Sequence, residues 1–487
     1  MSKEKPLKLF TIGDSLSQGV MSFSAAKPEK AFNTLIANLM DIEDYSYLKW
    51  EEGKRLPLDV ESIMRQLMKK HGNDLKYRHL VPMFLKILSE VDKTEDYFER
   101  GPGGIVEKVD TNREWFHNLA VSGMEVAEAF NVTSSFCKEV VRKSSKGEDN
   151  FFQAPNQSFY RIARRVLNPQ NKPDYDDYTA LDWLGHHART KGVENVILWL
   201  GANNALKTIV EMKVKPSNFK GSRDHWHMSK DEKACNLWHP DDFQADYEEL
   251  MTRIKSAMKD NVCKDWKIFV ATVPLLTICP LAKGMGEKRH VIEPGVNQEK
   301  RKALYYQYYT YFPLALDRAK ALDLILPFSD ALFVDRTIQK YNQIIRSLVE
   351  KSNGEGDKRF YLVDTCRMLG DAAWKRNYGT PYYDFPDYVN YRYPPVNTKM
   401  YHADRQGNLK KGGLFSLDGV HPSAIGQGII AREFLKVMTQ EAKLTINKTL
   451  DWAKIYESDS LYCQPISLME DIYEHEDLIF NLIKLID

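Results

Sequence analysis

The stretch LKLFTIGDSL (residues 7–16) decides the fold class of this 487-residue chain. Its apolar run from Leu7 to Ile12 is too short for a helix and ends at the turn residues Gly13-Asp14, just before Ser15. Similar short apolar runs follow at 195–200, 267–273 and 359–363. Runs of this length with little polar alternation are typical of strands that are buried on both faces of a parallel sheet.

Helical patterns alternate with these predicted strands. Apolar residues recur at helical spacing over 247–258, 337–350 and 425–437, where crossover connections between parallel strands belong. The order of strands and helices therefore predicts an α/β fold of three layers, with a mostly parallel sheet in the middle.

Composition and charge exclude several classes of function. The chain is 43% hydrophobic and 28% charged, as expected for a globular protein. Its 68 basic and 67 acidic residues give a net charge of +1, so no global field favours nucleic acid or an anionic membrane. The first residues contain neither a secretory leader nor a membrane span. We expect a cytoplasmic protein with no transmembrane segment, unless a leader was removed, and six scattered cysteines that stay reduced.

Long segments lie between the predicted core elements, at about 45–112, 140–180, 206–240, 278–335 and 368–412. Structureless loops of this length are uncommon in compact domains, so we expect most of these insertions to be helical and to form a cap. Residues 60–92 in particular show a helical pattern. We predict one hydrolase domain over 1–445 with these insertions, and a helical C-terminal extension over 446–487.

Ser15 is the first residue with a candidate chemical role. A serine in the turn after the first strand lies at the carboxyl edge of the sheet, beside a helix N-terminus whose free N–H groups favour negative charge. The alternative is that Asp14 or Ser15 only caps the following helix.

The motif Asp418-Gly-Val-His421-Pro-Ser lies near the other end of the chain. An aspartate three residues before a histidine can accept the Nδ1–H of the ring, which leaves Nε2 to face a nucleophile. The alternative is a solvated aspartate with a capping histidine in a turn.

Two further turns supply candidate oxyanion donors. In Asn118-Leu-Ala-Val-Ser-Gly123 the glycine lets a backbone N–H approach a reacting centre closely. In Gly201-Ala-Asn203 the asparagine follows a predicted strand and can donate its side-chain amide. With the Ser15 N–H, they would provide three donors for a tetrahedral oxyanion.

Together these four motifs resemble the signature blocks of the SGNH (GDSL) hydrolase family of lipases and esterases. Serine, glycine, asparagine and histidine occupy successive blocks in that family, and Ser15, Gly123, Asn203 and His421 match them in order. The resemblance implies a flavodoxin-like parallel sheet with the site at its carboxyl edge. It covers the turns and the sheet framework but not the insertions.

The expected activity is hydrolysis of a carboxylic ester through an acyl-enzyme intermediate, with Ser15, His421 and Asp418 as catalytic residues. The expected substrate is a small-molecule ester, either lipid-like or an O-acetylated carbohydrate, and no cofactor is required. Two alternatives on the same fold stay open, an acyltransferase and a non-catalytic protein that binds an acylated ligand. The sequence leaves the oligomeric state undetermined.

Weaker signals concern substrate contacts and metals. The aromatic tract 382–393 leads towards Asp418, so Tyr383 and Tyr388, together with Asp14, are candidate substrate contacts, although a surface loop anchored by proline explains the tract equally well. The tract 305–312 has the composition of the buried face of a helix. Residues 224–227 with Cys235 and His239 fit no standard zinc spacing, so we predict no metal site.

Overall fold

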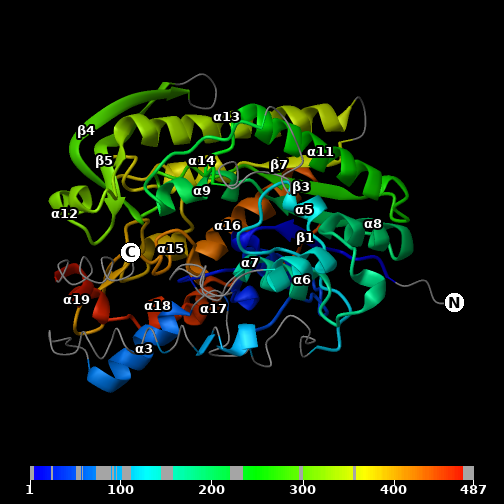
Figure 1. The fold of residues 1–487 in the computed structure, drawn as a ribbon, viewed down its shortest axis with the longest axis horizontal. Helices are drawn as coiled ribbons and strands as arrows, with labels where there is room; N and C mark the ends of the chain where they lie inside the picture. Colours follow the sequence, from blue (N-terminus) through cyan, green and yellow to red (C-terminus); the bar gives the residue numbers. More distant parts are fainter. Residues whose placement is uncertain are drawn as a thin grey trace.

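A parallel sheet of four strands organises the computed structural model of the chain (Figure 1). The structure describes residues 5–23, 26–50, 56, 59–72, 89, 93–94, 96–100, 111–143, 157–219, 234–294, 300–354 and 358–474. The strands are β1 (Phe10–Gly13), β2 (Asn195–Trp199), β3 (Lys267–Ala271) and β7 (Phe360–Val363), in the spatial order β1-β2-β3-β7. Each predicted strand is found in this sheet, which confirms an α/β fold with a parallel sheet.

Side chains of the sheet alternate between two apolar cores, one on each face. Along β2, Val196 and Leu198 join one core while Ile197 and Trp199 join the other, and all four are fully buried. This burial on both faces explains why the strands are continuously apolar in the sequence. Helices therefore cover both faces of the sheet.

The two layers of helices contain the predicted crossovers. The first core is covered by α5 (Glu128–Asn131), α6 (Ser134–Lys143), α7 (Ser158–Leu167), α8 (Ala180–Thr190), α9 (Asn203–Val210), α11 (Pro240–Lys259) and α13 (Phe328–Asn353). The second core is covered by α2 (Phe32–Leu39), α14 (Thr365–Ala372), α16 (Ala424–Lys436) and α17 (Trp452–Ser458). The helices predicted at 247–258, 337–350 and 425–437 correspond to α11, α13 and α16.

A short extended stretch lines the free edge of β1. Thr11 N–H donates to the His117 carbonyl at 2.8 Å, and the N–H groups of Leu119 and Val121 donate back to Thr11 and Gly13. This stretch leads directly into Gly123. On the other side of β1 the register places Gly13 beside Trp199, so the turn that carries Ser15 lies next to the turn that carries Asn203.

The insertion 278–335 corrects a prediction. We expected helices there, but its longest elements are the two antiparallel strands β4 (Ala282–Pro294) and β5 (Lys300–Tyr311), which form a hairpin that packs along α13 (Figure 1). The tract 305–312 is likewise mostly strand and not a helix face, because Tyr305 and Tyr309 pair across the hairpin with Arg289 and Gly284 of β4. Aromatic residues are common in strands, and here the pairing with β4 decides for a strand over a helix.

The remaining insertions are only partly described. The helical prediction for 60–92 holds over α3 (Val60–His71), and nearly all of the rest of that segment lies outside the described residues. Segment 368–412 contains the end of α14, α15 (Asp387–Tyr391) and a small hairpin of β8 (His402–Ala403) and β9 (Leu409–Lys411). The C-terminal extension is helical in α17, α18 (Ser460–Cys463) and α19 (Leu468–Glu474), while 475–487 lie outside the described residues.

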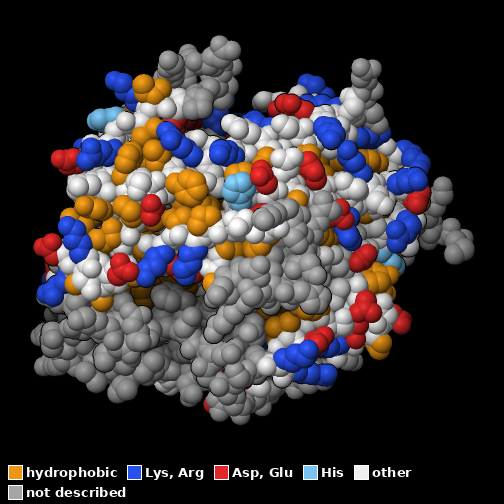
Figure 2. All heavy atoms as spheres, turned by 45° about the horizontal axis from the view of Figure 1, so that its top comes forward, with side chains coloured by type: hydrophobic (Ala, Val, Ile, Leu, Met, Phe, Trp, Pro, Cys, Tyr) orange, Lys and Arg blue, Asp and Glu red, His pale blue; other side chains and the backbone are white. Residues whose placement is uncertain are grey.

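The other short elements are α1 (Ser15–Gln18), α12 (Leu316–Ala321) and β6 (Leu326–Pro327), with single turns at Pro28–Lys30, Asp96–Arg100, Pro173–Tyr175 and Val437–Glu441. On the face seen in Figure 2, basic and acidic side chains are interspersed, as a net charge of +1 leads one to expect. In the part of the chain that the structure describes, no helix has the length and apolarity needed to cross a membrane. All six cysteines are free thiols.

Candidate active site

Ser15 begins α1 directly after β1, as the sequence predicts. The Asp14 carboxylate caps this helix by accepting the Leu16 N–H at 3.0 Å. A glycine is required at position 13, because a Cβ there would lie 2.4 Å from the Ser17 hydroxyl. The chain can therefore turn tightly out of the strand, and Ser15 lies at the carboxyl edge of the sheet.

His421 belongs to a tight loop before α16. One Asp418 oxygen accepts the backbone N–H groups of Val420 and His421, each at 2.8 Å, and so closes the turn from within. Gly419 has a φ of +65°, and a Cβ there would lie 2.6 Å from the Leu281 nitrogen. This tight turn over Asp418-Gly-Val-His421 therefore places the His421 imidazole beside the Asp418 carboxylate.

The structure brings these two distant segments into direct contact. His421 Nε2 lies 2.9 Å from the Ser15 hydroxyl, across 406 positions of sequence. His421 Nδ1 lies 2.8 Å from the second Asp418 oxygen. That oxygen also accepts the Phe23 N–H at 2.9 Å, and the first accepts the Ser416 hydroxyl at 3.2 Å. Serine, histidine and aspartate thus form one continuous chain of hydrogen bonds.

Asp418 and His421 are both buried, and each favours the charged form of the other. Burial would raise the pKa of Asp418, but the His421 imidazole and the backbone N–H groups of the loop hold it below its usual range. Burial would lower the pKa of His421, but the adjacent Asp418 carboxylate more than compensates and raises it. The histidine is thereby arranged to take up a proton on Nε2.

Asp14 is a buried acid beside the nucleophile and does not line the pocket next to Ser15. Burial raises the pKa of its carboxyl to about 7, against the opposing effects of the Leu16 N–H and of His421. Its second oxygen has no hydrogen-bond partner in the described part of the chain. As placed, Asp14 caps α1 and lies within the electrostatic reach of His421.

The candidate oxyanion donors lie on two turns that touch. Asn203 lines the pocket with Ser15 and His421, and its amide donates one N–H to the Met124 carbonyl at 3.0 Å, which leaves the other N–H for a ligand. Gly123 has a φ of +89°, and its N–H has no partner among the described residues. The Ser122 N–H donates to Gln18 at 3.0 Å, so the glycine turn is fixed to α1.

The pocket beside Ser15 is small and apolar. Its volume is about 40 Å3, small beside the roughly 300–1,000 Å3 of typical small-molecule pockets. Its walls come from α9, α14, the segment after β3 and the loop before α16, and include Leu206, Pro274, Leu276, Ile278, Leu369 and Phe415. We did not predict these walls. The apolar run after the third strand was the available signal, because it must start at the carboxyl edge of the sheet.

Tyr383 and Tyr388 do not line this pocket. The Tyr383 hydroxyl donates to Glu433 at 2.6 Å, near the end of α16 that lies farthest from His421, and accepts from Arg432 at 2.9 Å. The Tyr388 ring packs against Tyr456, with centroids 5.4 Å apart. These contacts fit the surface-loop interpretation of the tract better than a role in substrate binding.

Comparison with known proteins gives no identity, since no protein-family model, curated protein or solved structure matches the chain. Within the described residues, no three His, Cys, Asp or Glu side chains are grouped so that they could hold a metal ion. Residues 224–227, which we considered as metal ligands, lie outside that part of the chain. Function therefore has to be inferred from the chemistry of the site.

Proposed function

We propose that the chain is a serine ester hydrolase of the SGNH type, with Ser15 as nucleophile. The observation that carries this proposal is the hydrogen-bonded series Ser15, His421 and Asp418, which joins opposite ends of the sequence at one edge of the sheet. Such an array is the arrangement that activates a hydroxyl for acyl transfer.

The reaction proceeds in two halves. His421 Nε2 takes the Ser15 proton while the oxygen attacks the ester carbonyl carbon, and the resulting oxyanion is held by N–H groups of Ser15, Gly123 and Asn203. Collapse of this intermediate breaks the ester bond, and His421 returns the proton to the departing alcohol. Water then attacks the acyl-enzyme with His421 again as base, and the carboxylic acid leaves.

The sheet supports the family assignment. With the stretch 117–121 counted as a strand beside β1, the strands follow the spatial order 2-1-3-4-5, which is the order of flavodoxin-like sheets. In such folds the ligand binds at the carboxyl ends of the strands, where Ser15 lies. The six free thiols support the expected cytoplasmic setting.

The narrow apolar pocket favours a short acyl group. Its volume of about 40 Å3 is small beside the roughly 300–1,000 Å3 of typical small-molecule pockets, so the pocket fits a short acyl group better than a long fatty acyl chain. Among the two substrate types expected from the sequence, an acetylated polar molecule therefore fits better than a lipid ester. A purely binding protein fits less well, because nothing in acyl-ligand binding requires a histidine bonded to the serine.

The test is hydrolysis of p-nitrophenyl esters from acetyl to palmitoyl by the wild type and by Ser15→Ala. We expect turnover of the short esters, its loss in the variant, and an unchanged melting temperature. Turnover retained by the pure variant would contradict the proposal.

A further inference from the structure

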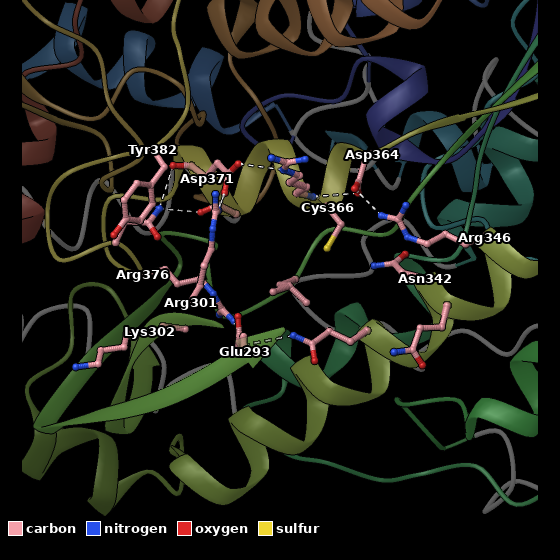
Figure 3. Close-up of a pocket in the computed structure, with 17 residues that line it drawn as sticks. Glu293, Arg301, Lys302, Asn342, Arg346, Asp364, Cys366, Asp371, Arg376 and Tyr382 are labelled. Atoms are coloured by element: carbon pink, nitrogen blue, oxygen red, sulfur yellow. Dashed lines mark hydrogen bonds and ion pairs between the residues drawn. The ribbon is translucent and has the colours of Figure 1, made fainter. Parts of the chain in front are cut away.

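A second and larger cavity lies on the other side of the segment that walls the Ser15 pocket. It has a volume of about 240 Å3 and opens between the β4–β5 hairpin, α13 and α14 (Figure 3). We call it the charged cleft, because Arg301, Arg346, Arg376 and their partner carboxylates line it. Asn342, which also lines the cleft, bonds both backbone groups of Val273 at 2.7 and 2.8 Å and fixes the shared wall.

Two arginines of the charged cleft, Arg301 and Arg346, are more exposed than the acids that hold them. Arg301 pairs with Asp371, and their side chains are 40% and 16% exposed. Arg346 pairs with Asp364, and theirs are 41% and 26% exposed. The other oxygen of the Asp364 carboxylate accepts a hydrogen bond from the Thr272 hydroxyl at 3.0 Å. The acids thus lie behind the guanidinium groups, and the groups offered to a ligand are mainly cationic donors.

Most of the donors on these two arginines are unused. A guanidinium carries five N–H groups, and Arg301 and Arg346 each direct only one nitrogen, Nη1 and Nη2 respectively, at a described acceptor. Figure 3 shows the two side chains entering the cleft from different elements, the hairpin and α13. The remaining forked N–H groups match the oxygens of phosphate and carboxylate groups in geometry as well as in charge.

The floor of the charged cleft is preorganised. Arg376 is only 6% exposed and lies between Asp335 and Glu293, with the Tyr305 hydroxyl at 2.8 Å. A buried ionic network of this kind contributes little net stability, so its most direct effect here is to hold the floor in one shape. The volume of the cleft suits a small molecule.

We infer that the charged cleft is a binding site for a small anion, recognised through phosphate or carboxylate groups by Arg301 and Arg346. This site is separate from Ser15 and does not depend on the proposed esterase activity. The anion is recognised by the paired N–H groups of the planar guanidinium. A lysine ammonium at the same position therefore binds the anion less tightly.

The test is isothermal titration calorimetry of the full chain at low salt with three probes: inorganic phosphate, citrate and, as an uncharged control, glucose. We expect saturable binding of phosphate, of citrate or of both, weakened by added salt, and none of glucose. Arg301→Gln and Arg346→Gln should each weaken binding about tenfold or more. The matched control is Arg253→Gln on α11, which removes an arginine of similar exposure, 50%, that is also paired with an acid, Glu249.

Should the glutamine variants fail to fold, Arg346→Lys provides a second test, because it keeps a positive charge beside Asp364 and removes only the forked guanidinium N–H groups. This variant should still weaken anion binding severalfold. Binding of phosphate alone would identify a phosphate group as the ligand feature, and binding of citrate alone a carboxylate. The inference is overturned if neither anion binds saturably, or if Arg301→Gln and Arg346→Gln bind as tightly as Arg253→Gln.

Discussion

Replacing Asp418 by asparagine tests the role of the buried carboxylate in the site. Its first oxygen accepts from Ser416, Val420 and the His421 backbone, and its second accepts from Phe23 and from His421 Nδ1. An asparagine satisfies the three donors on the first side with its carbonyl oxygen. Its amide NH2 group then faces His421 Nδ1, which can accept only if the ring proton moves to Nε2. In that tautomer Nε2 can no longer take the proton of Ser15.

The size of the expected loss in kcat follows from this change of the His421 tautomer. We expect kcat for p-nitrophenyl acetate to fall about 10⁴-fold, which corresponds to about 5 kcal/mol of activation free energy. Unfolding should become easier by about 1–3 kcal/mol, because the Phe23 N–H loses its acceptor. Steady-state kinetics and thermal melts measure the two effects separately.

The matched control is Asp404→Asn, which alters another aspartate that caps backbone groups, since Asp404 accepts the Asn408 N–H at 2.8 Å. This variant should lose some stability and keep full turnover. Folded Asp418→Asn protein with a kcat within tenfold of the wild type would refute the reasoning.

Three further predictions follow from the site. Because Asp418 raises the pKa of His421 and the reaction needs the neutral imidazole, kcat/KM should fall as the pH drops through an apparent pKa above about 6.5; a limb below about 6 would contradict this. Burial raises the pKa of Asp14 to about 7, so the native state loses stability as the pH rises from about 4 to 7. Asp14→Asn should therefore melt like the wild type near pH 4 and at a higher temperature at pH 8, where its unfolding free energy should exceed that of the wild type by up to about 4 kcal/mol; an equal difference at both pH values would exclude this origin. Leu276→Ala enlarges the pocket beside Ser15 and should shift the preferred substrate from acetyl or butyryl esters towards hexanoyl esters. Efficient hydrolysis of palmitoyl esters by the wild type would show that the pocket does not limit acyl chain length.

The sheet and the candidate catalytic residues were predictable because their determinants are local. Strands such as 195–199 are buried on both faces and are therefore almost entirely apolar. Each candidate catalytic or oxyanion-hole residue follows a strand or lies in a short turn motif. Parallel strands end at a common edge, so motifs that follow strands must meet there. That rule places Ser15 and Asn203 at one edge, whereas the Asp418–His421 turn follows no strand of the parallel sheet and reaches this edge through the packing of the loop before α16.

Features that depend on packing between insertions were not predictable in the same way. The tract 305–312 is rich in aromatic residues at spacings that suit either a strand or a helix, and only its pairing with β4 decides for a strand. Tyr383 was a candidate substrate contact because its tract leads towards Asp418, yet its hydroxyl hydrogen-bonds to Glu433 on α16. The charged cleft combines residues from the hairpin, α13 and α14, whose proximity no local pattern indicates.

Labelling with a fluorophosphonate tests the central claim most directly, because the reagent reacts with a hydroxyl only when a neighbouring base activates it. We expect the intact wild-type chain to gain the mass of one label, peptide mapping to place the label on Ser15, and Ser15→Ala and His421→Ala to remain unlabelled. A folded wild-type protein that takes up no label, or takes it up at a residue other than Ser15, would show that Ser15 is not the activated nucleophile.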